Sequence, residues 1–274
     1  MKSITVKILI TFALLVSTNV IAQEKLHIEG STTVGPVADG FAEAFKSMYP
    51  DTAITVNKSG SGTGATALID GRCDIATMSR FMKDTEFKDA VAKGVFPVAH
   101  AIAMDGICVV VHPSNPINAL TTEQVRDIYI GKITNWKQLG GPDTQIVVIS
   151  RDTESGTYDT FETFIMKSQK MASNVEYVNS NPQMFARVQS TSGAVGYVGF
   201  GFVKTGVKAL TVNGVKPSVQ TIISGQYSLS RPLYMFTNGY PKLGSMTHKF
   251  VTFHLTEKGQ EVIEDKGFVA LTNY

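Results

Sequence analysis

The chain has 274 residues, of which 43% are hydrophobic and 18% are charged, with 25 lysines and arginines against 23 aspartates and glutamates. Lys2 and Lys7 lie in the first 22 positions, where no acidic residue lies, so the charges balance over residues 23–274. This balance argues against general binding to nucleic acid or to an acidic membrane, and an anion would have to bind at a local site.

The N-terminal segment has the features of a secretory signal peptide. Its two lysines precede an apolar run over residues 8–16, and small residues stand before a cleavage point that we place after Ala22. The run is too short for a membrane-spanning helix. The sequence therefore predicts an exported chain whose folded part begins near residue 23.

The rest of the chain is long enough for one large domain or two modest ones. Cys73 and Cys108 permit one disulfide in an oxidising compartment, but their apolar neighbours also suit two buried free thiols. The five histidines are scattered, and no Cys/His cluster has the spacing of a metal site. We therefore expect neither a metal nor another cofactor.

Strands and helices alternate in the first part of the chain. Strands are expected over residues 26–29, 52–57 and 74–78, and a helical pattern follows each, over 36–48, 65–71 and 83–93. A β-α-β-α-β-α order predicts an α/β fold with a mostly parallel sheet.

The second part is less regular. The run from Ala99 to Val111 is long for one strand and carries Asp105-Gly106 in its middle. Residues 204–230 are polar and loop-rich. Further strands are expected over 146–149, 193–199, 209–212 and 233–236, and further helices over 122–129, 158–165, 181–188, 244–254 and 256–265.

Three segments share one pattern, in which a strand is followed by a hydroxyl-rich turn and then by a helix. They are Gly30-Ser31-Thr32-Thr33, Ser59-Gly60-Ser61-Gly62-Thr63 and Arg151 with Ser155-Gly156-Thr157. Ligands of open α/β sheets bind at the carboxyl ends of strands, where helix N-termini offer unpaired N–H groups. Arg151 adds a planar charged fork that suits a tetrahedral oxyanion. The three turns together predict an anion site.

The residues of each turn can also have ordinary structural roles, and an enzyme is an alternative to a binding protein. The hydroxyls can cap helices, Arg151 can pair with Asp152 or Glu154, and Arg80 can lie in solvent. Ser61 is preceded at two positions by a serine rather than a glycine, so it does not form a nucleophile elbow. The phosphate-loop motif is also missing. We therefore predict no catalytic residues, and an exported phosphate-ester hydrolase stays the less favoured alternative.

The turns belong to a longer series of motifs that resembles the periplasmic phosphate-binding proteins of phosphate ABC transporters, the PstS-like family. The motifs occur in that family's order and extend over nearly all of residues 23–274. They are Gly30-Ser31-Thr32-Thr33-Val34-Gly35-Pro36, Gly60-Ser61-Gly62-Thr63-Gly64, Gly71-Arg72-Cys73-Asp74-Ile75-Ala76 with Ser79-Arg80, Asn135-Trp136, Arg151 with Ser155-Gly156-Thr157, and Gly193-Ala194-Val195-Gly196-Tyr197.

The resemblance implies a type II periplasmic-binding-protein fold, in which two α/β lobes joined by two crossing hinge strands close on the ligand. After the signal peptide that the leader residues predict over 1–22, it implies a first lobe from 23–106 with 232–274 and a second lobe over 107–231. The crossings are expected near Asp105–Val109 and Arg231–Leu233. The phosphate-binding residues that it implies are Ser31, Thr32, Thr33, Ser61, Ser79, Arg80, Arg151, Ser155, Gly156 and Thr157.

The same resemblance implies a monomer in the periplasm that binds inorganic phosphate, delivers it to permease subunits in the inner membrane, and binds no nucleic acid. The chain departs from the family's pattern at Ser79, where some members have an aspartate that accepts the proton of phosphate. Asp105 and Glu154 are candidate replacements, and the alternative for Asp105 is a turn or hinge residue. Another tetrahedral oxyanion, such as sulfate or molybdate, therefore stays an alternative, as does a secreted adhesion role.

Overall fold

The strands and helices follow from the alternating pattern of the sequence. The computed structural model describes residues 24–271, and the predicted signal peptide lies outside them. The strands are β1 (Lys25–Gly30), β2 (Ala53–Lys58), β3 (Ile75–Met78), β4 (Pro97–Val111), β5 (Ala119–Leu120), β6 (Val147–Arg151), β7 (Glu176–Val178), β8 (Ala194–Gly199), β9 (Lys208–Ala209), β10 (Thr211–Val212) and β11 (Ser230–Asn238). The α-helices are α1 (Gly35–Met48), α2 (Ser61–Ile69), α3 (Asp84–Ala92), α4 (Thr122–Tyr129), α5 (Gly156–Phe161), α6 (Asn181–Gln189), α7 (Val219–Ile223), α8 (Met246–Val251) and α9 (Glu257–Asp265). Short 3₁₀ turns cover Trp136–Leu139, Phe200–Phe202 and Phe253–Leu255, and a π turn covers Glu162–Met166.

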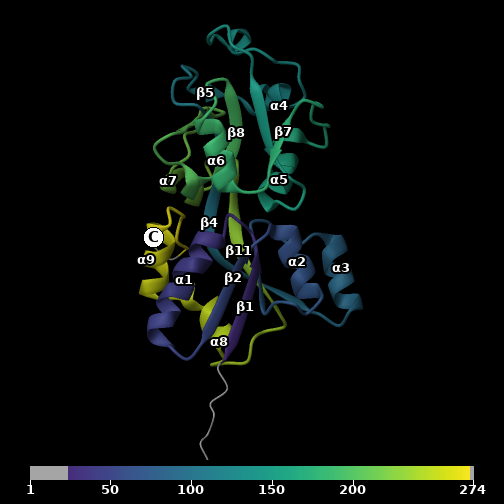
Figure 1. The fold of residues 1–274 in the computed structure, drawn as a ribbon, viewed down its shortest axis with the longest axis vertical. Helices are drawn as coiled ribbons and strands as arrows, with labels where there is room; N and C mark the ends of the chain where they lie inside the picture. The colour runs from purple at the N-terminus through teal and green to yellow at the C-terminus, as the bar shows by residue number, and fades with distance from the viewer. Residues whose placement is uncertain (1–23, 272–274) are drawn as a thin grey trace, which may run out of the picture.

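One mixed sheet runs through the whole molecule, in the order β2-β1-β3-β11-β4-β8-β6-β7, with β9 beside β4. The pairs of β1 with β2 and β3 are parallel, and so are those of β6 with β7 and β8, as the βαβ order predicts. Figure 1 shows two lobes stacked along the long axis, with β4 and β11 running between them. The predicted two-lobe α/β fold is confirmed.

The two crossing strands connect the lobes where their pairing partners change. Strand β4 pairs with β11 as far as Gly106, and from Ile107 onward it pairs with β8. Asp105 lies directly opposite Arg231 in the antiparallel pair of β4 and β11. The long apolar run that the sequence left ambiguous is therefore one strand that belongs to both lobes.

The first lobe joins the two ends of the chain. Phe41 and Phe45 on α1 pack edge-on against Phe250 and Phe253 near the C-terminus, with ring centroids 5.0 to 5.9 Å apart. Each such pair contributes about 0.5–1.5 kcal/mol beyond its buried area. We propose the lobe boundaries that the resemblance implied, 23–106 with 232–274 and 107–231, because the core clusters divide near these residues.

The second lobe has its own aromatic core, which reaches toward the site. Phe161 stacks on Tyr197 with centroids 4.0 Å apart, and Tyr129 packs beside both rings. The buried Tyr197 hydroxyl accepts the backbone N–H of Arg151 at 3.1 Å, so the core fixes the end of β6.

The structure adds one helix that the sequence did not predict, and it decides the state of the two cysteines. The segment 204–230, which the sequence predicted to be loop-rich, contains the short helix α7, and Ser218 caps it. The sequence did not reveal this helix because five residues show too little hydrophobic periodicity. Cys73 and Cys108 are buried free thiols. Burial raises the pKa of Cys73 to about 12, so that thiol stays protonated and unreactive.

Candidate anion-binding site

The first turn holds its hydroxyls in place with its own backbone. Ser31, Thr32 and Thr33 connect β1 to α1 and are buried. The Oγ of Ser31 accepts the N–H groups of Thr33 and Val34, at 3.1 and 3.2 Å. This bonding fixes the direction of the turn at the start of α1.

The glycine-rich turn brings Ser61 into the same region. Gly60 has a φ of 115°, a conformation that favours glycine, and it is the N-cap residue of α2, which begins at Ser61. Ser61 is completely buried, its Oγ accepts the N–H of Ser79 at 3.1 Å, and the two hydroxyl oxygens lie 3.4 Å apart. Two of the predicted donors of the first lobe are therefore neighbours.

Arg151 ends β6 and is 1% exposed. Its Nη2 donates to the Asn179 carbonyl of the same lobe at 2.7 Å, and to Thr32 Oγ1 of the first lobe at 3.2 Å. Its Nη1 is buried and has no hydrogen-bond partner among the residues that the structure describes. Desolvation lowers the pKa of Arg151 to about 10, so the guanidinium still carries its charge near neutral pH. A buried charged donor without a partner is the strongest sign of an anion site in this molecule.

The turn before α5 completes the cluster from the second lobe. Ser155 caps α5, with its Oγ accepting the N–H of Tyr158 at 3.2 Å. Thr157 Oγ1 lies 3.0 Å from Thr33 Oγ1 of the first lobe. A Cβ on Gly156 would lie 2.7 Å from Ser79 Oγ, so only glycine permits this approach of the lobes. All three predicted turns meet, and the lobes are closed around them.

A buried ion pair supports the α5 turn from the hinge. Arg231 donates to Asp105 Oδ2 from Nε and Nη2, at 3.1 and 2.9 Å, and Nη2 also donates to Thr157 Oγ1 at 2.8 Å. Asp105 Oδ1 accepts the N–H of Phe200 at 2.8 Å. Burial raises the pKa of Asp105, and the pairing with Arg231 opposes that rise. Both oxygens of Asp105 are engaged, so this carboxylate positions Arg231.

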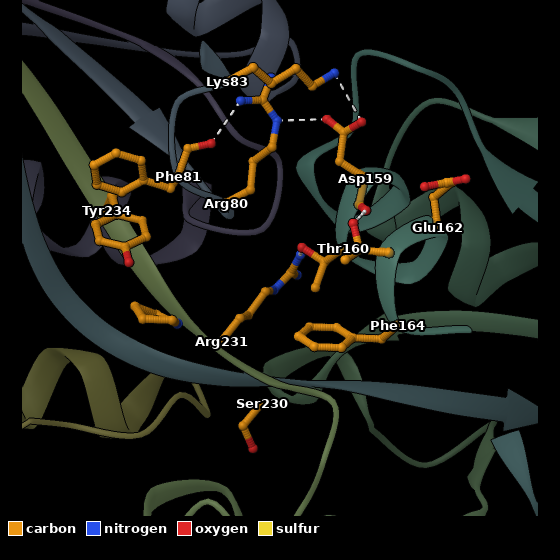
Figure 2. A pocket seen from close by; sticks show the side chains of 12 residues that line it. Arg80, Phe81, Lys83, Asp159, Thr160, Glu162, Phe164, Ser230, Arg231 and Tyr234 are labelled. Carbon is orange, nitrogen blue, oxygen red and sulfur yellow. Dashed lines mark hydrogen bonds and ion pairs between the residues drawn. The ribbon is translucent and has the colours of Figure 1, made fainter. Parts of the chain in front are cut away.

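Arg80 lies at the boundary between the lobes and bonds to carboxylates. It donates to Glu86 at 2.6 Å and to Asp159 of the second lobe at 2.6 Å, and Lys83 also pairs with Asp159 at 3.0 Å. Figure 2 shows the contacts of Arg80 and Lys83 with Asp159. These three residues line an inter-lobe cavity of about 550 Å³, which Arg231 also lines. Each guanidinium nitrogen of Arg80 already donates to a protein oxygen, whereas the resemblance implied that Arg80 binds the anion.

Sequence reasoning missed Asn181 and assigned no role in the site to Arg231. Asn181 is buried, and its Nδ2 donates to Thr33 Oγ1 at 2.9 Å and to Thr32 Oγ1 at 3.4 Å. Its Oδ1 accepts the N–H of Gly199 at 3.2 Å. The pair Asn181-Pro182 indicated only the start of a helix, and its bonds to residues about 150 positions away leave no local sequence signal.

Neither a metal site nor a membrane span occurs in residues 24–271. No group of three or more histidine, cysteine, aspartate or glutamate side chains gathers there in a way that could hold a metal ion. The helices of that part of the chain are too short or too polar to cross a membrane.

Comparison with known proteins identifies the family. A family model described as a PBP superfamily domain matches residues 17–258. The phosphate-binding protein PstS of Borreliella burgdorferi is 30% identical over 257 residues, which cover 90% of this chain and 90% of that protein. The PstS protein of Staphylococcus saprophyticus is 35% identical over 260 residues, covering 89% of this chain and 79% of the relative.

Solved structures agree with the sequence relatives. A phosphate ABC transporter substrate-binding protein of Clostridium perfringens, with bound phosphate, superposes with a TM-score of 0.84 at 34% identity, over 91% of this chain and all of that one. An ABC-type phosphate transport receptor from Vibrio cholerae gives a TM-score of 0.73 at 34% identity, over 89% of this chain and 99% of the other. The chain therefore belongs to the PBP superfamily and, within it, to the PstS family of phosphate-binding proteins.

Proposed function

We propose that this chain captures inorganic phosphate outside the cytoplasm and delivers it to the permease of an ABC importer. The single observation that carries the proposal is the buried Nη1 of Arg151, which has no partner in residues 24–271 and belongs to a side chain whose Nη2 donates to Thr32 of the opposite lobe. Leaving a buried charged donor unpaired costs more than about 1–3 kcal/mol, and an anion would remove that cost. The relatives are named as phosphate-binding or phosphate transport proteins, which favours phosphate over sulfate or molybdate as the ligand.

The proposed ligand contacts come from both lobes. They are Ser31, Thr32, Thr33, Ser61 and Ser79 from the first lobe, and Arg151, Ser155, Gly156 and Thr157 from the second. We assign Arg80 to the contact between the lobes rather than to the anion, because its nitrogens bond to Glu86, Asp159 and the Phe81 carbonyl.

Closure follows from this division of the contacts. An anion that bonds both lobes stabilises the closed state by its difference in affinity for the closed and open states. The Arg80–Asp159 pair and the Thr33–Thr157 contact form in the same closed state. We propose that the permease recognises this closed form, and that the protein acts as an exported monomer.

The proposed role is binding without catalysis. Hydrolysis by a serine would need a base within hydrogen-bond reach of the nucleophile. Within residues 24–271, Ser61 Oγ bonds to Ser79 alone, and no histidine bonds to a serine or threonine of the site. This arrangement supports a transport protein over a phosphate-ester hydrolase.

Isothermal titration tests the proposal directly. We expect phosphate to bind one site with micromolar affinity or better, since several charge-assisted hydrogen bonds of about 1.5–3 kcal/mol each outweigh the desolvation of a dianion. A chromogenic phosphate ester should show no turnover. Failure of the protein to bind any tetrahedral oxyanion would refute the transport function.

Gly156→Ala should obstruct closure while sparing the fold. The new methyl group would lie against Ser61 Oγ and 2.7 Å from Ser79 Oγ, both in the opposite lobe. Because overpacking of this kind costs about 1–3 kcal/mol, we expect phosphate affinity to fall about tenfold to a hundredfold with an unchanged melting temperature. Thr163→Ala, an exposed change just after α5, is the matched control. An affinity within about threefold of the parent protein would contradict the closed geometry.

A further inference from the structure

Two turns of the anion site carry the residues of an ion pair between the lobes. Arg80 follows Ser79 just after β3 of the first lobe. Asp159 lies in the first turn of α5 of the second lobe, two residues after Thr157. Arg80 Nε donates to Asp159 Oδ2 at 2.6 Å, and Lys83 Nζ lies 3.0 Å from Asp159 Oδ1 (Figure 2). One carboxylate of the second lobe therefore bonds to two cations of the first lobe, through one oxygen each.

Glu86, on α3 of the first lobe, fixes the direction of the Arg80 side chain. The two oxygens of Glu86 accept from Nη1 and Nη2 of Arg80 at 2.8 and 2.6 Å, and one also accepts the backbone N–H of Lys83 at 2.8 Å. Arg80 Nη1 donates to the Phe81 carbonyl at 2.9 Å as well. Because all these partners belong to the first lobe, Arg80 keeps its direction when the lobes separate, and Asp159 is the partner that moves.

The ion pair is largely shielded from water in the closed state. The side chain of Arg80 is 8% exposed and that of Asp159 is 19% exposed. Water and salt nearly cancel an ion pair at the surface, whereas a charge-assisted hydrogen bond away from water is stronger. Since Asp159 moves with the second lobe, opening of the lobes exposes its carboxylate to solvent and breaks the pair.

The charge of Asp159 would oppose anion binding if it acted on the ligand directly. A carboxylate repels a nearby anion, so removal of its charge should strengthen phosphate binding if electrostatics alone decided the effect. A contact that holds the lobes closed makes the opposite prediction, because its loss favours the open state and weakens binding. The sign of the change in affinity therefore distinguishes the two explanations.

We propose that Asp159 is a positioning residue, which holds the lobes closed over the anion without touching it; this inference rests on the proposed phosphate-binding function. Its bonds to Arg80 and Lys83 hold the start of α5 against the first lobe. At that point Gly156 lies against Ser79. The free energy of these bonds adds to closure around any bound anion. Because the pair forms after the ligand has entered, it acts mainly on the rate of ligand release.

Titration and stopped-flow kinetics of Asp159→Asn with inorganic phosphate test the inference. Asparagine keeps the size of the side chain and removes its charge. We expect phosphate affinity to fall about fivefold to thirtyfold, mainly through faster dissociation. The melting temperature without phosphate should stay within about 2 °C of the parent value, since the open state lacks the pair. Glu123→Gln is the matched control, because it removes an acidic group from the first turn of α4 in the same lobe, and it should change the affinity less than about twofold.

Lys83→Met provides a second variant at an exposed position. The Lys83 side chain is 46% exposed and pairs with Asp159. We expect this change to weaken phosphate binding about threefold in the parent protein and less than about 1.5-fold in Asp159→Asn, because the lysine acts through the carboxylate. A general effect of its positive charge on the anion would instead be equal in both backgrounds.

The outcomes separate this inference from the proposed function. If the parent protein binds phosphate and a folded Asp159→Asn protein binds it equally or more tightly, Asp159 does not hold the lobes closed. An equal loss on Lys83→Met in both backgrounds would also overturn the inference. If Asp159→Asn does not fold, unchanged phosphate affinity in Lys83→Met overturns it instead. Absence of phosphate binding by the parent protein would remove the proposed function itself.

Discussion

Replacing Arg151 by alanine is expected to weaken phosphate binding at least about a hundredfold, because the change removes the charged group whose buried Nη1 has no protein partner. A charge-assisted contact in a closed, dry site is worth far more than one at the surface. Arg151→Lys should recover only part of the affinity, since an ammonium group keeps the charge but loses the planar fork. Isothermal titration measures both variants.

The folded state should tolerate the loss of Arg151 better than the binding site does. The guanidinium is 1% exposed, and burial lowers its pKa, so the charge is costly to the empty protein. We therefore expect the melting temperature without phosphate to stay the same or rise. Arg187→Ala, which removes an exposed pair with Glu176 in the same lobe, serves as the control. A loss of affinity under about threefold in Arg151→Ala would mean that this side chain is not a ligand.

The turns of the site could be predicted because their information is local. Ser31, Ser61 and Ser155 each follow a strand and precede a helix within a few residues, and the hydroxyl and glycine content of each turn is visible in the sequence. Their convergence followed from the rule that ligands lie at the carboxyl ends of parallel strands. The family resemblance added the two crossing strands.

The supporting contacts could not be predicted, because they join distant parts of the chain. Arg231 and Asp105 are 126 positions apart, and only the pairing of β4 with β11 brings them opposite each other. The family resemblance implied that Arg80 binds the anion together with Ser79. One of its partners, Asp159, lies on the other lobe, 79 positions away, and that contact could not be read from the sequence.

Arg231→Met is expected to lower the free energy of unfolding by about 3–5 kcal/mol near neutral pH, because it leaves the fully buried Asp105 without its countercharge. Urea denaturation measures this loss. The double variant Asp105→Asn with Arg231→Met removes both charges and keeps a side-chain acceptor for the N–H of Phe200. It should regain most of the stability, since a neutral pair in the same space avoids the uncompensated charge.

The deficit of Arg231→Met should also depend on pH with a definite sign. Burial already raises the pKa of Asp105, and removing the cation takes away the largest opposing influence, so the folded-state pKa rises further above the unfolded value. Between these two values the folded state binds more protons than the unfolded state, so the stability of the variant falls as pH rises through that window. The loss relative to the parent protein is therefore greatest above the raised pKa and shrinks as the pH approaches the ordinary carboxyl range. Equal deficits at about pH 5 and about pH 8 would show that Asp105 is not an uncompensated charge in the variant, and that the hinge does not depend on this ion pair.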